Sequence, residues 1–190
     1  MNNIGPNVPE HLDQTLGVQK DQNVFSYEEK DFWILEYSDQ PDRGACSYIT
    51  VGLGRHLLTQ DSGSEIRQEF MITVWDDYIN THAENQLASL SLDLLDRHIP
   101  VPNNQVIPWQ GAIFEKYEFS AMYCTSARHM TEEFEMIESE PNLVFVWLIP
   151  IYPEEQNYIQ EVGWSKFENL VEIQQPDFFD LERPRVRVEI

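Results

Sequence analysis

The sequence is poor in basic residues. Its 190 residues include only 12 Lys and Arg against 33 Asp and Glu, which gives a formal net charge of -21 at pH 7. A chain with this charge repels phosphate backbones and anionic lipid headgroups, so nucleic-acid and membrane partners are disfavoured. The same charge favours a basic partner. The length fits one domain, and 42% hydrophobic residues are enough to build a buried core.

Cysteines and long apolar runs are also scarce. The chain has only Cys46 and Cys124, which excludes a disulfide-rich scaffold and indicates two buried thiols in a reduced protein. The longest apolar run, Leu143–Ile151, falls far short of the roughly 18 residues of a membrane-spanning helix. The first residues have neither the basic start nor the apolar stretch of a signal peptide. The sequence therefore predicts a cytoplasmic protein.

Motifs for catalysis and metal binding are missing as well. None of the five histidines has the spacing of a helical zinc site, and no Gly-x-Ser-x-Gly nucleophile elbow occurs. The glycine-rich stretch 52–56 lacks the third glycine of a dinucleotide turn and the Lys-Ser/Thr pair of a phosphate loop. We therefore predict no metal, no cofactor and no enzymatic activity. A hydrolase that uses clustered carboxylates is the weaker alternative.

Hydrophobic patterns predict strands first and helices later. The runs typical of strands are 31–37, 45–53, 65–75, 106–109, 112–125 and 143–150. The periodic segments typical of helices are 153–162, 164–175 and an earlier one, in which apolar residues recur from Ala83 to Leu95 before Pro100 and Pro102 stop it. Thr81 and Glu84 have the spacing of a capping box before the first helix, and Gly163 fits the end of the second. This order predicts a single α+β domain with a mixed, largely antiparallel sheet and helices packed on it.

Two strands differ in how they should be buried. In 65–75, one face is mostly apolar and the other carries Arg67 and Glu69, which is typical of a half-buried antiparallel strand. Residues 143–150 are apolar on both faces, so both faces should be covered.

The ends of the chain carry weaker signals. Residues 1–30 are mostly polar and predict a flexible N-terminal arm with a short helix around Pro9–Leu16, so that 31–190 form the domain. Alternating Val186, Val188 and Ile190 predict an edge strand at the C-terminus.

Acidic residues concentrate in the second half of the sequence. Between Thr131 and Glu182 there are 13 acidic residues and one basic residue, Lys166. An acidic docking surface for a basic protein would use such a distribution, because complementary charge speeds association. Aromatic side chains supply the anchors of many interfaces. The candidate partner-binding residues are Asp76, Asp77, Glu154, Glu155 and Trp164.

An ordered set of motifs resembles one known family. The set comprises ITVGLGRH (49–56), EIRQEFMITV (65–74), VFVWLIPIYPEE (144–155), EVGWSKFENLVEI (161–173) and FFDLERPRV (178–186). In this order and spacing, the chain resembles the suppressor of fused domain. The resemblance implies a binding domain: the animal member restrains a transcription factor by clamping a peptide of it. Stand-alone bacterial members are similar to immunity proteins, which bind and neutralise a cognate toxin domain.

The resemblance leads to a functional and a structural hypothesis. The functional one is an immunity protein that binds a basic toxin domain, with a regulatory scaffold that adds a partner strand to a sheet edge as the alternative. The structural one is an ion-pair network that joins Arg67 and Glu69 to Asp180 and Arg183, and fixes the final segment to the sheet. The oligomeric state stays open.

Overall fold

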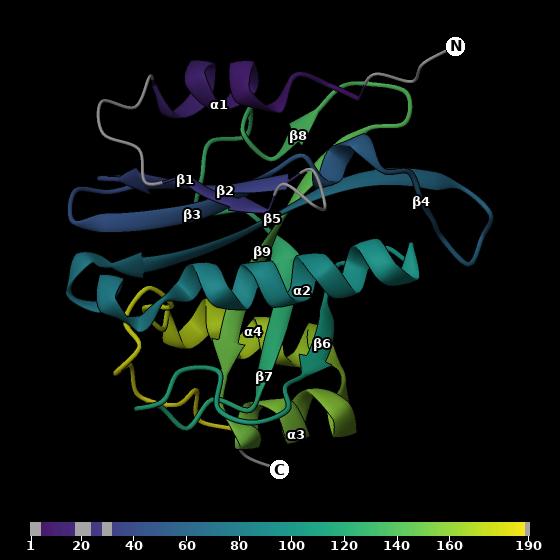
Figure 1. Ribbon diagram of the computed structural model, residues 1–190. Coiled ribbons are helices and arrows are strands. Elements are labelled where there is room, and N and C mark those ends of the chain that lie inside the picture. The colour runs from purple at the N-terminus through teal and green to yellow at the C-terminus, as the bar shows by residue number, and fades with distance from the viewer. Residues whose placement is uncertain (1–4, 18–23, 28–31, 189–190) are drawn as a thin grey trace.

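A twisted sheet of nine strands forms the centre of the computed structural model, which describes residues 5–17, 24–27 and 32–188 (Figure 1). The strand order is β1-β2-β3-β5-β9-β7-β6, and two short strands add to it, β4 beside β5 and β8 beside β9. The strands are β1 (Val24–Tyr27), β2 (Phe32–Ser38), β3 (Ala45–Val51), β4 (Leu58–Thr59), β5 (Glu65–Trp75), β6 (Gln105–Pro108), β7 (Ala121–Ser126), β8 (Met136–Ile137) and β9 (Leu143–Ile151).

Most of the sheet is antiparallel. The exception is the central pair, in which β5 and β9 run parallel with Arg67 opposite Leu143 and Met71 opposite Trp147. The predicted mixed, largely antiparallel sheet with packed helices is therefore confirmed.

Helices cover both faces of this sheet. They are α1 (Val8–Leu16), α2 (Ala83–Arg97), α3 (Pro153–Val162) and α4 (Trp164–Gln174). One face packs against α2, where Leu87 and Leu94 are buried with Phe70 of β5. The other face packs against α1, α3 and α4. No helix among the described residues is both long and apolar enough to cross a membrane.

Alternating side chains explain how single strands serve both cores. Successive residues of a strand point to opposite faces, so in β9 Leu148 joins the α2 side while Phe145 and Trp147 join the other. The prediction that this strand is covered on both faces is confirmed. The prediction that residues 65–75 are half-buried is wrong. Residues 67–74 of β5 are all buried, because β5 lies in the middle of the sheet beside β9.

Part of the predicted N-terminal arm is packed on the sheet. Helix α1 covers the predicted short helix, and its Val8 and Leu12 are buried in the core on the α3–α4 side. The His11 ring stacks on Phe145 at 5.5 Å between centroids. Residues Val8–Leu16 are thus packed on the sheet. The predicted boundary between residues 30 and 31 lies outside the described residues.

Three local predictions are wrong. Thr81 does not cap α2: its hydroxyl donates to the Tyr78 carbonyl oxygen at 2.7 Å, because a 3-10 turn, η3 (Asp76–Thr81), runs directly into His82, the N-cap residue. The strand expected over 112–125 is shorter, since residues 109–120 form a loop before β7. Residues 175–188 contain no strand, because this segment is held by side chains instead of a sheet edge.

Candidate functional site

The carboxyl end of β5 meets the C-terminal segment of the chain. Beyond Trp75 the chain turns into η3, and the Asp76 amide donates to the Gly44 carbonyl oxygen at 2.8 Å. The Trp75 amide donates to the Phe179 carbonyl oxygen at 3.1 Å, and its indole Nε1 donates to Asp177 at 2.8 Å. Residues about one hundred positions apart therefore share one surface, on which the candidate residues Asp76 and Asp77 are exposed.

A tyrosine extends this surface. The Tyr78 hydroxyl donates to Asp180, whose Oδ1 also accepts the Glu182 amide at 2.8 Å. Burial raises the pKa of Tyr78, and the Asp180 carboxylate raises it further, so Tyr78 is a neutral donor at pH 7. We call the resulting set of five carboxylates the acidic face: Asp76, Asp77, Asp177, Asp180 and Glu182.

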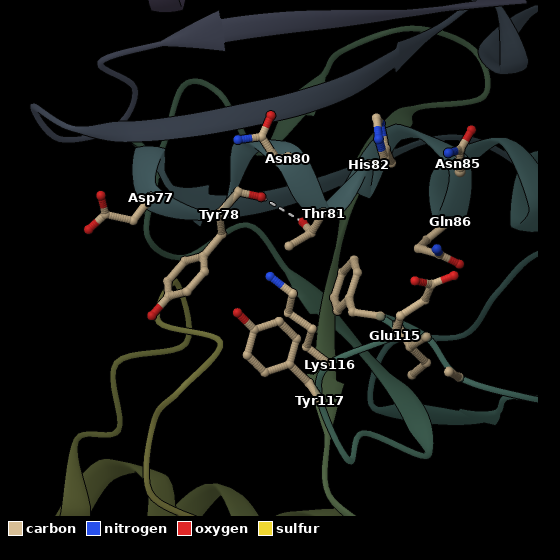
Figure 2. Close-up of a pocket in the computed structure, with 13 residues that line it drawn as sticks. Asp77, Tyr78, Asn80, Thr81, His82, Asn85, Gln86, Glu115, Lys116 and Tyr117 are labelled. Carbon is tan, nitrogen blue, oxygen red and sulfur yellow. Dashed lines mark hydrogen bonds between the residues drawn. The ribbon is translucent and has the colours of Figure 1, made fainter.

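A hollow of about 500 Å³ opens beside the acidic face, between η3, the start of α2 and the loop before β7 (Figure 2). The Tyr78 and Tyr117 rings meet edge to face at 6.1 Å, and Phe114 packs against Tyr117 at 6.5 Å. The polar side chains of the hollow are Asp77, Asn80, Thr81, His82, Asn85, Gln86, Glu115 and Lys116. It therefore combines aromatic surface with hydrogen-bond donors and acceptors, as protein interfaces do.

A buried ion pair fixes the C-terminal segment. The Arg183 guanidinium donates to both Glu155 oxygens at 2.7 Å, and both side chains are almost inaccessible to solvent. Arg183 also lies 5.0 Å from the Tyr152 ring centre and 4.8 Å from that of Phe178. Glu155 accepts the amides of Tyr152 and Val186 as well. The candidate role of Glu155 as a surface contact is therefore wrong, because all its acceptor capacity is used inside the protein.

The predicted single ion-pair network is also wrong, because its members lie at two ends of the sheet. Arg67 donates to the Gly54 carbonyl oxygen at 2.6 Å, opposite the start of β9. Glu69 binds Thr50 and the turn after β3. Arg183 binds the Pro150 carbonyl oxygen near the other end of β9, and Glu155 of α3.

The remaining candidate residues are exposed but separate. Glu154 lies 3.4 Å from Arg185, which also pairs with Glu118. Trp164 is 45% exposed at the corner between α3 and α4. Within the described part of the chain, neither Glu154 nor Trp164 forms a hydrogen bond or ion pair with the acidic face.

The described residues offer neither a metal-binding cluster nor a reactive thiol. No group of three His, Cys, Asp or Glu side chains there can hold a metal ion. Burial raises the pKa of the Cys46 thiol to about 12 and also raises that of Cys124. Both thiols stay protonated at neutral pH and are poor nucleophiles.

Sequence patterns missed the aromatic part of the surface and its C-terminal acids. Tyr78 and Tyr117 belong to no motif, and Asp177 and Glu182 only add to a general acidic excess. One signal was available: FFDLERPRV places two aromatic, two acidic and two basic residues within nine positions. Only the tertiary structure brings this segment next to η3, where Asp180 binds Tyr78.

Comparisons with known proteins agree on one family. The family model described as Suppressor of fused protein (SUFU) matches residues 28–184. The chain is 26% identical over 163 residues to "Immunity protein YqcF" of Bacillus subtilis (strain 168), a match that covers 80% of each sequence.

Solved structures show the same fold. A suppressor of fused homologue from Neisseria gonorrhoeae FA 1090 superposes with a TM-score of 0.76 at 17% identity, covering 96% of each chain. A chain of the Sufu–Fu complex gives a TM-score of 0.70 at 12% identity, covering 95% of this chain and 96% of that one. Drosophila Suppressor of Fused gives 0.65 at 14% identity, and the match covers 90% of this chain but 48% of the fly protein.

Proposed function

Because this chain belongs to the suppressor of fused family, we propose that it is an immunity protein that neutralises a cognate toxin domain by binding it directly. The similarity to a protein named as an immunity protein supports this proposal. It is a binding function, and it needs neither a metal nor a nucleophile. The cytoplasmic location inferred from the sequence is part of the same proposal.

The acidic face is the surface that carries the proposal. Three of its carboxylates come from the C-terminal segment and two from η3, and the buried Arg183–Glu155 pair holds that segment in place. A rigid surface loses little conformational freedom on binding. Its charge fits a basic toxin domain, and Tyr78 and Tyr117 of the adjacent hollow supply aromatic anchors.

A search of the neighbouring genes for a toxin domain, followed by binding to that domain, tests the proposal. We expect a 1:1 or higher-order complex in calorimetry, and loss of toxin activity when the two are mixed. Because the surface is charged, the association rate should fall by about tenfold or more between 50 and 500 mM salt. A specific complex whose association rate does not change with salt concentration would contradict the acidic face as the docking surface. The absence of any complex would contradict the immunity function.

The free edge of β6 supports a second candidate, a scaffold that binds an extended partner segment. The Trp109 amide donates to the Ser120 carbonyl oxygen at 2.9 Å. Hydrogen-bonded pairs alternate along an antiparallel ladder, so the peptide groups of Val106 point away from β7. Pro108, which has no N–H, follows two residues later on the same side. A groove of about 520 Å³ runs between this edge and α2, beside Ile99, which is 58% exposed.

Val106→Pro tests strand addition at this edge. The substitution removes an N–H that a partner strand would use, but no N–H of the β6–β7 ladder. If a partner strand binds here, its affinity should fall at least tenfold while the melting temperature changes by only a few degrees. Unchanged affinity would contradict strand addition at β6. Ile107→Pro is the control, because it removes a ladder hydrogen bond and should lower stability instead.

A further inference from the structure

The turn after β3 is held by one buried carboxyl group. Glu69 belongs to the buried part of β5, and its side chain has no exposed surface. Its Oε1 accepts the amides of Gly52 and Gly54 at 2.8 and 2.9 Å. Its Oε2 accepts the Thr50 hydroxyl at 2.6 Å. Every hydrogen bond of this carboxyl group therefore holds the turn η2 (Leu53–Arg55) or the strand that leads into it.

The N-terminal segment rests on the same turn. A Cβ atom added to Gly5 would lie 2.8 Å from the Gly54 carbonyl oxygen and 3.3 Å from Cα of Arg55, so the two backbones are in close contact. Gly5 lies three residues before α1, whose Val8 and Leu12 are buried in the sheet core. The turn thus lies between Glu69 and the start of α1.

No cation neutralises Glu69 among the contacts described. On β5, Arg67 donates to the Gly54 carbonyl oxygen at 2.6 Å, and the acidic Glu65 is the first residue of the same strand. On the turn, the Arg55 guanidinium lies over the Trp33 ring at 5.3 Å, and His56 follows at its end. From β9 the turn meets the apolar Leu143, and from β3 the uncharged Thr50.

We propose that Glu69 is a pH-sensitive latch, whose protonated carboxyl group closes the 52–55 turn on the sheet and thereby secures the start of α1. When Glu69 ionises, the buried charge favours an opened turn in which water reaches the carboxylate. The Thr50 hydroxyl, 2.6 Å from Oε2, can serve both forms: it donates to a charged carboxylate, and can accept from the Oε2–H group when Glu69 is neutral.

The direction of the pH response follows from burial. Burial raises the pKa of Glu69 to about 7, from an ordinary value near 4.5 that the opened turn would restore. The closed form therefore binds the proton more tightly, and the latch is firm at pH 5. The opening equilibrium should rise by about tenfold per pH unit between these two values and level off above pH 7.

Native-state hydrogen exchange of the full chain tests the latch. Protection factors of the Gly52 and Gly54 amides, corrected for intrinsic exchange, should fall about tenfold per pH unit from pH 5 to 7. Amides of α1 should follow them. The free energy of this opening should change less with denaturant concentration than that of the opening that exposes β7 amides, because only a part of the chain opens.

Two variants and one measurement decide the outcome. In Glu69→Gln the pH dependence should vanish, while Glu65→Gln, an exposed residue of the same strand, should keep it. If Glu69→Gln fails to fold, the carboxyl carbon of Glu69 observed by NMR in the natural chain should titrate near pH 7. Protection that ignores pH, a Glu69 titration near 4.5, or turn amides that open only with β7 would each overturn the proposal.

Discussion

Replacing Arg183 with Ala should destabilise the protein by about 3–5 kcal/mol, because the substitution leaves the Glu155 carboxylate buried without its cation. Both partners are almost fully buried, and the pair is bidentate at 2.7 Å. The loss also removes the stacking of the guanidinium on Tyr152 and Phe178. For a chain of this size, the melting temperature should fall by on the order of 10 °C.

Two further variants separate this effect from a general loss of charge. Arg185→Ala removes a neighbouring guanidinium that is about half exposed, so it should cost no more than about 1 kcal/mol. Arg183→Met with Glu155→Gln removes both charges and keeps a side-chain oxygen that can accept from the Tyr152 or Val186 amide, so it should be less destabilising than Arg183→Ala alone. A change below about 1 kcal/mol for Arg183→Ala would show that the pair does not anchor the C-terminal segment.

Reversing two charges of the acidic face should weaken toxin binding strongly while leaving the fold intact. Asp76 and Asp77 are exposed and make no ion pair among the described residues, so Asp76→Lys with Asp77→Lys should change stability little. Like charges brought together at an interface cost several kcal/mol, so the affinity should fall by about a hundredfold or more. Calorimetry and surface-based kinetics on the same toxin domain would measure it.

A matched control has the same net charge as this double variant. Glu132→Lys with Glu133→Lys makes the same change of charge in an exposed loop next to Phe134, which contacts α1 on the opposite side of the sheet from α2. This variant should slow association only through the overall field of the protein. Equal losses of affinity for the two double variants would contradict a localised docking surface at Asp76 and Asp77.

Much of the fold follows from local patterns in the sequence. The 3.6-residue period of α2 and the apolar run of β9 predict those elements, since each pattern reflects burial of the residue that carries it. Pro153 and Gly163 mark the ends of α3 correctly for the same local reason. The predicted capping box failed because Thr81 ends a 3-10 turn that no pattern announces, which makes His82 the N-cap residue of α2.

The candidate site was predictable only in part, and one pair of neighbours shows why. Glu154 and Glu155 are adjacent in the first turn of α3, yet Glu154 reaches the surface and Glu155 has no exposed area. Adjacent residues of a helix point about 100° apart, so which one is buried depends on where the helix docks. The same holds for Arg67 and Arg183, which were predicted to share a network. Instead, Arg67 binds the Gly54 carbonyl oxygen beside the start of β9, and Arg183 binds the Pro150 carbonyl oxygen near its other end.

The sequence by itself determined the charge of the protein, the type and order of its main strands and helices, and its membership of the suppressor of fused family. These properties are sums or local periodicities, and they need no knowledge of distant contacts. The tertiary structure alone decided which carboxylates form the acidic face and which are consumed inside, as Glu69 and Glu155 are. A carboxylate takes its role from the donors that surround it, and here those donors lie up to a hundred residues away along the chain.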